Sequence, residues 1–326
     1  MRTELLDILA EPGTGARLRL EGAPAANGRV DEGRLVSEAT GKAYPIVAGI
    51  PRFVAAENYA QSFGMQWNRF REVQIDSATG ASFSRRRFDA EMGWTAEELG
   101  GKWILDAGCG AGRLAEIAAE RGANLVALDY SNAVDAAAKV LAGYPNVDLV
   151  QASLLEPPFR QGVFDYAYCV GVVQHTPDPP AVIANVVALV RAGGQFSFTI
   201  YHRRPWTKLN AKYLLRPITR RLPPEMLLRG IEAAMPALFP LTDRLFRVPG
   251  LGRVAQFLIP VATYVDRDGL SDEQRYAEAV LDTFDMLSPR YDSPMTDGEV
   301  DAVLRAAGAA RWDFRTRAPI NVVGWR

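Results

Sequence analysis

The chain has 326 residues, of which 48% are hydrophobic and 23% are charged, and its formal net charge is −1. This length exceeds one typical domain, and the composition is that of a soluble globular protein. The sequence lacks a signal-peptide apolar core at its start and any run near the ~20 apolar residues of a membrane span. Two cysteines alone cannot form a disulfide framework or a zinc site. We therefore expect a cytoplasmic protein without a metal.

Residues 1–54 predict a small β module. Short apolar or alternating runs over 17–20, 34–36 and 43–51 are separated by Gly/Pro and Gly/Asn turns, which is the spacing of short strands. An aromatic-rich helix over 59–70 follows and begins the larger domain, 55–326. Its aromatic residues recur at i, i+4 and i+7 and so share one face.

The next part of the chain alternates strands and helices, as a doubly wound, mostly parallel α/β sheet does. Five strands are predicted, separated by helices over 112–121, 132–143 and 179–191, and a last antiparallel pair over 312–316 and 320–325 makes seven. In such sheets a ligand binds at the carboxyl ends of the strands. The five strands cover 103–106, 124–129, 147–151, 163–170 and 195–201.

The first of these strands runs into Asp106 and a loop with Gly108, Gly110 and Gly112, after which a helix begins. Glycine permits positive φ and lets the backbone approach a ligand closely, and the N–H groups at a helix N-terminus favour a nucleotide-like ligand. A dinucleotide fingerprint reads G-x-G-x-x-G, whereas this run reads G-x-G-x-G. Asp129, nineteen residues after Gly110, can accept both hydroxyls of a ribose.

At these residues the sequence resembles the class I S-adenosylmethionine-dependent methyltransferases. "ILDAGCGAGRLAEIA" is similar to their first motif and "LVALDYS" to their second. The resemblance implies their seven-stranded Rossmann-like fold and S-adenosylmethionine as cofactor, with S-adenosylhomocysteine as its product. It implies that the cofactor is bound by Asp106, Gly108, Cys109, Gly110, Gly112, Asp129, Tyr130, Ser153, Leu154, Val170, Gln66 and Trp67.

Three of these positions carry open questions. Ser153 stands where the family commonly has an acid that accepts from the adenine amino group, so we expect weaker adenine recognition. Gln66 and Trp67 are expected near the methionine carboxylate, together with Arg71 or with one of the arginines in 85–87, because a guanidinium can bond both carboxylate oxygens. The sequence does not choose among these arginines.

The N-terminal segments "LLDILAEPGTG" and "GKAYPIVAGIPRFV" resemble the short zinc-ribbon domain that partners or precedes some tRNA and protein methyltransferases. The ribbon cysteines of that domain are absent, and Glu11 stands where the first is expected. We therefore expect a zinc-ribbon-like cap without metal.

His175 follows the fourth strand in "CVGVVQHTP", where the resemblance places the substrate beside the methyl group. Its unperturbed pKa suits a general base. The alternative is a structural residue that holds the Thr-Pro turn, since many methyltransferases act by proximity alone. Further substrate contacts are expected from residues at the same sheet edge, namely Tyr201, Asp285, Arg290 and Tyr291.

A helical insertion over 202–290 follows the fifth strand, and its prolines are expected to break it into several helices. Between residues 201 and 260 there are eleven Lys and Arg against three acids, a net charge of +8. Such a basic and apolar segment can be a lid over an anionic or lipid-like acceptor or a peripheral membrane contact through 202–260. It can also be an oligomer interface or an ordinary solvated cap.

The sequence thus predicts methyl transfer to an O or N atom of a small-molecule or lipid-linked acceptor. A tRNA methyltransferase is the alternative that the N-terminal resemblance suggests. Nucleic acid is disfavoured by the net charge and by the absence of an Asn/Asp-Pro-Pro-Tyr/Phe segment. A third hypothesis is a catalytically silent scaffold that binds the cofactor.

Overall fold

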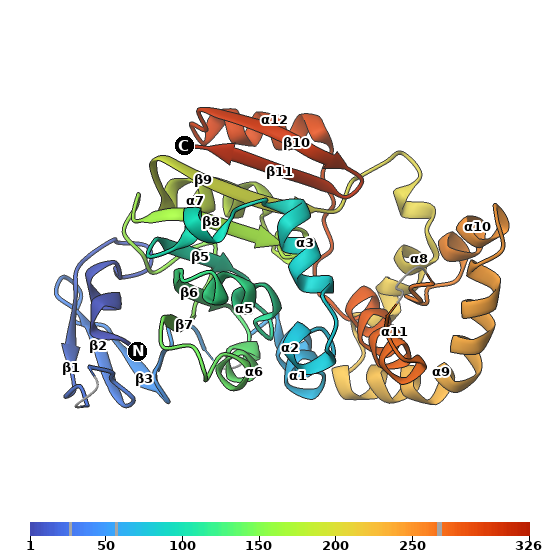
Figure 1. Ribbon diagram of the computed structural model, residues 1–326, viewed down its shortest axis with the longest axis horizontal. Helices are drawn as coiled ribbons and strands as arrows, with labels where there is room; N and C mark the ends of the chain where they lie inside the picture. Colours follow the sequence, from blue (N-terminus) through green and yellow to red (C-terminus); the bar gives the residue numbers. More distant parts are fainter. Residues whose placement is uncertain (26–27, 56–57, 266–268) are drawn as a thin grey trace.

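The structure is a computed structural model that describes residues 1–25, 28–55, 58–265 and 269–326. Figure 1 shows a small N-terminal sheet at one end, a large sheet flanked by helices in the middle, and a group of helices at the other end.

The large sheet has seven strands in the order β10-β11-β9-β8-β5-β6-β7. All neighbouring strands from β9 to β7 are parallel, and β11 is antiparallel to both β9 and β10. This confirms the predicted doubly wound sheet and its last antiparallel pair. The strands are β5 (Trp103–Ala107), β6 (Asn124–Asp129), β7 (Val147–Gln151), β8 (Phe164–Val170), β9 (Val190–Ile200), β10 (Arg311–Arg317) and β11 (Ile320–Trp325).

The two faces of the sheet bury separate apolar clusters, because neighbouring residues of a strand point to opposite faces. Leu105 packs with helices on one face, and Ile104 packs with helices on the other. The first face is covered by α7 (Pro179–Leu189) and α12 (Asp297–Ala306), and the second by α3 (Phe83–Glu91), α4 (Ala96–Leu99), α5 (Arg113–Glu120) and α6 (Ala133–Val140). Both cysteines are buried, as expected for small core residues.

The N-terminal module is a four-stranded antiparallel sheet that packs on the edge of the large sheet. Arg2 forms an ion pair of 2.8 Å with the buried Asp148 of β7, and the N–H of Phe53 donates to the carbonyl of Gln151 at 2.8 Å. Module and large sheet share one apolar cluster. The module comprises the 3-10 helix η1 (Thr3–Asp7) and β1 (Leu18–Glu21), β2 (Gly33–Ser37), β3 (Ala43–Val47) and β4 (Ile50–Pro51).

Within the described residues, the aromatic-rich helix and three further helices connect the module to the large sheet. The aromatic-rich segment forms α1 (Gln61–Arg69), followed by α2 (Asp76–Thr79). α1 contacts α6 of the sheet layer and also α9 and α11 of the helical layer. It therefore bridges the two sides of the molecule.

The insertion after β9 contains α8 (Ala211–Thr219), α9 (Pro224–Phe246), α10 (Leu251–Leu258) and α11 (Asp272–Leu287), with 266–268 outside the described residues. The insertion is divided into several helices as expected, but the expectation that they break at Pro217, Pro236 and Pro240 was wrong. Pro217 lies inside α8, and Pro236 and Pro240 lie inside the 23 residues of α9. A proline inside a helix lacks an N–H donor and its ring crowds the carbonyl four residues earlier, and the buried contacts of α9 with α11 hold the helix together despite this cost.

Candidate active site

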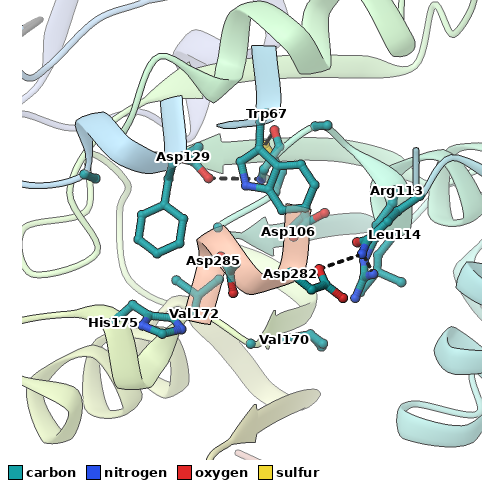
Figure 2. A pocket seen from close by; sticks show the side chains of 18 of the residues that line it. Trp67, Asp106, Arg113, Leu114, Asp129, Val170, Val172, His175, Asp282 and Asp285 are labelled. Carbon is teal, nitrogen blue, oxygen red and sulfur yellow. Dashed lines mark hydrogen bonds between the residues drawn. The ribbon is translucent and has the colours of Figure 1, made fainter. Parts of the chain in front are cut away.

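A cavity of about 720 Å³ lies at the carboxyl ends of the parallel strands. Its floor is formed by residues that follow β5, β6, β7, β8 and β9, and its cover comes from α1, α8 and α11. Figure 2 shows labelled side chains from α1, from α11 and from the ends of β5, β6 and β8 around one space. This volume is within the ~300–1,000 Å³ range of small-molecule sites.

The glycine loop between β5 and α5 needs its glycines for two reasons. Gly108 and Gly110 have φ values of +96° and +55°, which side chains other than glycine rarely adopt. A Cβ atom on Gly108 would lie 2.4 Å from Val172, and one on Gly110 would lie 3.1 Å from Trp67. The bare backbone therefore forms a wall of the cavity that a side chain would fill.

Asp129 at the end of β6 is fixed beside this loop. One carboxylate oxygen accepts the N–H of Gly110 at 3.0 Å, and the other accepts the N–H and the hydroxyl of Ser131 at 2.8 and 2.7 Å. Burial raises the pKa of the Asp129 carboxyl, and the bonds from Ser131 and Gly110 oppose this rise. The group is thus oriented by its neighbours and faces the cavity as an acceptor.

Asp106 at the end of β5 is 3% exposed, and its Oδ2 atom has no hydrogen-bond partner among the residues that the structure describes. Burial, assisted by the charge of Asp129, raises the pKa of Asp106 to about 8. An unpaired buried carboxyl oxygen is costly. A cationic amino group in the cavity would remove this cost, so the residues present fit a ligand such as S-adenosylmethionine.

α1 lies over the glycine loop as a cover. The indole of Trp67 lies against Gly110, where a Cβ atom would be 3.1 Å from the ring. One turn earlier, the ring of Phe63 lies 5.4 Å from the ring of His175. The aromatic face of α1 therefore faces both the cavity and the hydrophobic core.

His175 has a defined tautomer. Its Nδ1 atom lies 3.1 Å from the carbonyl oxygen of Tyr291, and because a carbonyl only accepts, Nδ1 carries the proton. The Nε2 atom is buried and has no partner among the described residues, while the ring lines the cavity beside Phe63 and Tyr201. The imidazole thus keeps a lone pair available, which a general base requires.

The structure brings most of the predicted site residues to one cavity. Those that line it are Asp106, Gly108, Cys109, Gly110, Asp129, Tyr130, Leu154, Val170, Trp67, His175, Tyr201 and Asp285.

Five predicted residues do not line the cavity. Gly112 is the N-cap of α5, and the hydroxyl of Ser153 is used by the N–H of Leu155. Gln66 is buried between helices and donates to Asp285 at 3.0 Å. The remaining two are Arg290, which is exposed, and Tyr291, which contributes its backbone carbonyl to His175.

The structure narrows the set of arginines that could bind the methionine carboxylate. It also adds Arg113, which the motifs did not indicate. Arg71 and Arg87 line the cavity, whereas Arg85 pairs with Glu120 and Arg86 lies over the ring of Phe83. Arg113, the first residue of α5, also lines the cavity. Its place directly after the glycine loop is the sequence feature that could have identified it.

The helical layer contributes Asp285, which the sequence analysis assigned to the site, and also Asp282 and Lys212, which it did not assign. Arg113 donates to Gln74, whose amide donates to Asp282 of α11 at 3.1 Å. Asp282 and Asp285 stand one turn apart on α11 and face the cavity, as Figure 2 shows. Lys212 of α8 lines the cavity too. No single motif could identify them, because each depends on how the insertion packs.

The sheet order and the glycine loop define a doubly wound, Rossmann-like α/β fold of the kind that class I methyltransferases have. Consistent with this, residues 105–198 match the family model described as a methyltransferase domain. The chain is 38% identical over 141 residues to the ubiquinone biosynthesis O-methyltransferase of Azotobacter vinelandii, which is 40% of this chain and 60% of the relative. It is 33% identical over 140 residues to the protein of the same name from Acinetobacter baumannii strain AYE, covering 40% and 59%.

The chain therefore spans about 60% of the length of the curated relatives it matches. Among solved structures, the phosphoethanolamine N-methyltransferase 1 of Haemonchus contortus, in complex with phosphoethanolamine and S-adenosylhomocysteine, is similar with a TM-score of 0.37 and 18% identity. That similarity covers 47% of this chain and 34% of the other. It is too low to add to the fold assignment.

Proposed function

We propose that this protein is an S-adenosylmethionine-dependent methyltransferase that methylates a hydroxyl oxygen of a small-molecule or lipid-linked acceptor. One observation carries the proposal: a bare glycine loop and the imidazole of His175 line the same cavity. The names of the relatives, which state O-methyl transfer in ubiquinone biosynthesis, support oxygen as the atom methylated.

Each cofactor-binding residue has a role that follows from its surroundings. The loop at Gly108 and Gly110 gives the cofactor room against the backbone, Asp129 accepts from ribose hydroxyls, and Asp106 accepts from the amino group. Arg113 offers a guanidinium to the carboxylate. When bound, S-adenosylmethionine supplies an electrophilic methyl group on a sulfonium.

His175 would remove the proton of the acceptor. A hydroxyl oxygen becomes a better nucleophile as its proton leaves, and Nε2 of His175 can take that proton because Nδ1 already donates to Tyr291. Phe63 and Tyr201 flank the imidazole with rings, which keeps water from this nitrogen. The protein thus orients the acceptor, excludes water and accepts a proton.

An extract assay with methyl-labelled S-adenosylmethionine tests the proposal. The wild-type protein is incubated with the donor and a cell extract, and the label is measured in RNA, protein, lipid and small-molecule fractions. We expect label in the lipid or small-molecule fraction, and much less of it with His175→Ala. Label in RNA would support a tRNA methyltransferase instead, and cofactor binding without any labelled product would support a silent scaffold.

We propose further that the N-terminal module is a zinc-ribbon-like cap in which hydrogen bonds replace the metal. Glu11 and Thr14 form one pair separated by two residues, and Ser37 and Thr40 form another. Three hydroxyls, from Thr14, Ser37 and Thr40, donate to the buried carboxylate of Glu11 at 2.6, 2.8 and 2.5 Å. Two such pairs meeting at one point have the spacing of zinc-ribbon ligands.

Metal analysis of the purified protein tests this proposal. We expect no stoichiometric zinc and a melting temperature that a chelator does not change. Stoichiometric zinc, or a chelator-induced loss of stability, would contradict it.

A further inference from the structure

The exposed apolar side chains of this protein are concentrated in the insertion. Of the large hydrophobic residues that the structure describes as exposed, only Val47 lies outside it. A monomeric soluble protein rarely gathers such residues in one region unless the region binds something. The members in the insertion are Trp206, Leu209, Leu214, Leu215, Ile218, Met226, Leu241, Val248, Leu251, Val254, Leu258 and Tyr264.

On α8 the charged side chains face the protein and the apolar side chains face solvent, which is the reverse of the usual arrangement on a surface helix. Its charged residues point inward: Lys212 pairs with Asp292 at 2.9 Å, and Arg216 donates to the carbonyls of Met286 and Pro289 at 3.1 and 2.8 Å. Its apolar residues point outward, with Leu214 65% and Ile218 64% exposed. These interactions of Lys212 and Arg216 fix which side of α8 faces the protein. Leu214 and Ile218 therefore form an apolar stripe that remains exposed.

α10 carries a second outward apolar stripe. Leu251, Val254 and Leu258 recur at i, i+3 and i+7 and are 54 to 60% exposed. On the opposite side, Gly252 packs so closely on α9 that a Cβ atom there would lie 2.2 Å from the carbonyl oxygen of Phe246. This close packing fixes the orientation of α10. Figure 1 places α8 and α10 at the same end of the molecule, away from the N-terminal module.

Exposed cations accompany these stripes. Arg220 and Arg221 follow Ile218 at the end of α8, and Arg253 lies between two stripe residues of α10. Within the described part of the chain, eight exposed cations of the insertion have no carboxylate partner at ion-pair distance, namely Arg204, Lys208, Arg220, Arg221, Arg229, Arg244, Arg253 and Arg290. A lipid bilayer with anionic headgroups is apolar inside and negatively charged at its surface. It therefore complements apolar stripes that lie next to unpaired cations.

We propose that the stripes of α8 and α10 dock on an anionic phospholipid membrane, with the apolar side chains in the interface and the cations on the headgroups. No helix within the described ranges has both the length and the hydrophobicity to cross a bilayer, so the contact is peripheral. Because Lys212 lines the cavity while Leu214 of the same helix faces outward, docking would bring the cavity close to the membrane. The docking itself does not depend on the proposed methyl transfer.

Vesicle co-sedimentation of the full chain tests the proposal. The probes are vesicles of phosphatidylcholine alone and vesicles of phosphatidylcholine mixed with phosphatidylglycerol. We expect sedimentation with the mixed vesicles only, and its loss as salt is raised, because exposed charges are screened. No sedimentation with either probe, or equal sedimentation with both, would overturn the proposal.

Two double variants and one matched control locate the contact. Leu214→Glu with Ile218→Glu on α8, and Leu251→Glu with Leu258→Glu on α10, should each weaken partition on the order of tenfold or more. Val47→Glu removes a similarly exposed apolar side chain outside the insertion and should change nothing. Unchanged binding by both double variants overturns the proposal. Circular dichroism and melting temperature establish that each variant is folded.

Light scattering after size exclusion distinguishes a membrane from a second copy of the chain. We expect the wild type to elute with the mass of one chain. A wild-type dimer that the same double variants dissociate would assign the stripes to self-association and overturn membrane docking.

Discussion

The two halves of the cavity are built in different ways. The cofactor half is mainly backbone and two carboxylates at the ends of adjacent parallel strands, all within residues 106–131. The acceptor half is assembled from side chains of α1, α8, α11 and the ends of β8 and β9, which are far apart in sequence. Changes in the first half should therefore alter cofactor affinity, and changes in the second half should alter turnover.

His175→Ala should show the largest difference between the effect on turnover and the effect on cofactor affinity. Loss of the general base should lower kcat by ~10²–10⁴-fold, while the affinity for S-adenosylmethionine stays close to that of the wild type. His202→Ala is the matched control, because His202 lies outside the cavity near Asp297. Steady-state kinetics and calorimetry measure the two effects. Unchanged turnover would retire His175 as the base.

Asp129→Ala should show the reverse pattern. It removes a charged acceptor that the Gly110 and Ser131 bonds orient, and charge-assisted bonds of this kind contribute about 1.5–3 kcal/mol, or roughly 10–150-fold in affinity. Asp135→Ala, which removes a carboxylate paired with Arg52 outside the cavity, is the control. Calorimetry with S-adenosylhomocysteine provides the comparison, and equal affinities for the two variants would contradict the assignment.

The cofactor half should also be sensitive to pH. With a pKa of about 8, Asp106 carries a proton at pH 7, and that proton must leave before the carboxylate can accept from a cationic amino group. Affinity should therefore rise with pH by up to about tenfold per unit below pH 8. Calorimetry from pH 6.5 to 8 measures this, and Asp106→Asn should abolish the rise. A flat wild-type profile would show that Asp106 does not exchange a proton on binding.

A substitution in the N-terminal module, outside both halves of the cavity, should change the stability of the protein and not its activity. Hydrogen bonds, first from Thr14, lower the pKa of Glu11 to about 2 from its usual 4.5. A depressed pKa contributes stability that is present above pH 4.5 and is lost as pH falls toward 2. Glu11→Ala should therefore lower the melting temperature at pH 7, with a smaller difference near pH 3, and leave kcat unchanged. The same difference at both pH values would contradict this account of the carboxylate.

The cofactor half could be predicted from the sequence because it is local. The loop and Asp129 lie within one strand-helix-strand unit, whose geometry the spacing of glycines and acids fixes. Arg113 lies in the same strand-helix-strand unit, but the glycine motif does not require an arginine at that position. Gln66 illustrates the opposite case: it lies beside Trp67 on α1, yet it is buried against Asp285 of α11, and only the packing of the two helices decides this.

The insertion was the least predictable part, since tertiary contacts override local propensity there. Prolines that predict breaks lie inside α8 and α9. The net charge of +8 over 201–260 could not reveal that Lys212 and Arg216 face inward while the leucines of the same helix face solvent.

Calorimetric titration of S-adenosylmethionine into the wild-type chain and into Asp129→Ala tests the central claim most directly. We predict saturable binding of one cofactor per wild-type chain and a loss of affinity on the order of 10–100-fold in the variant. Absence of binding to the wild type, or equal binding by both proteins, would contradict a methyl-donor site at the glycine loop.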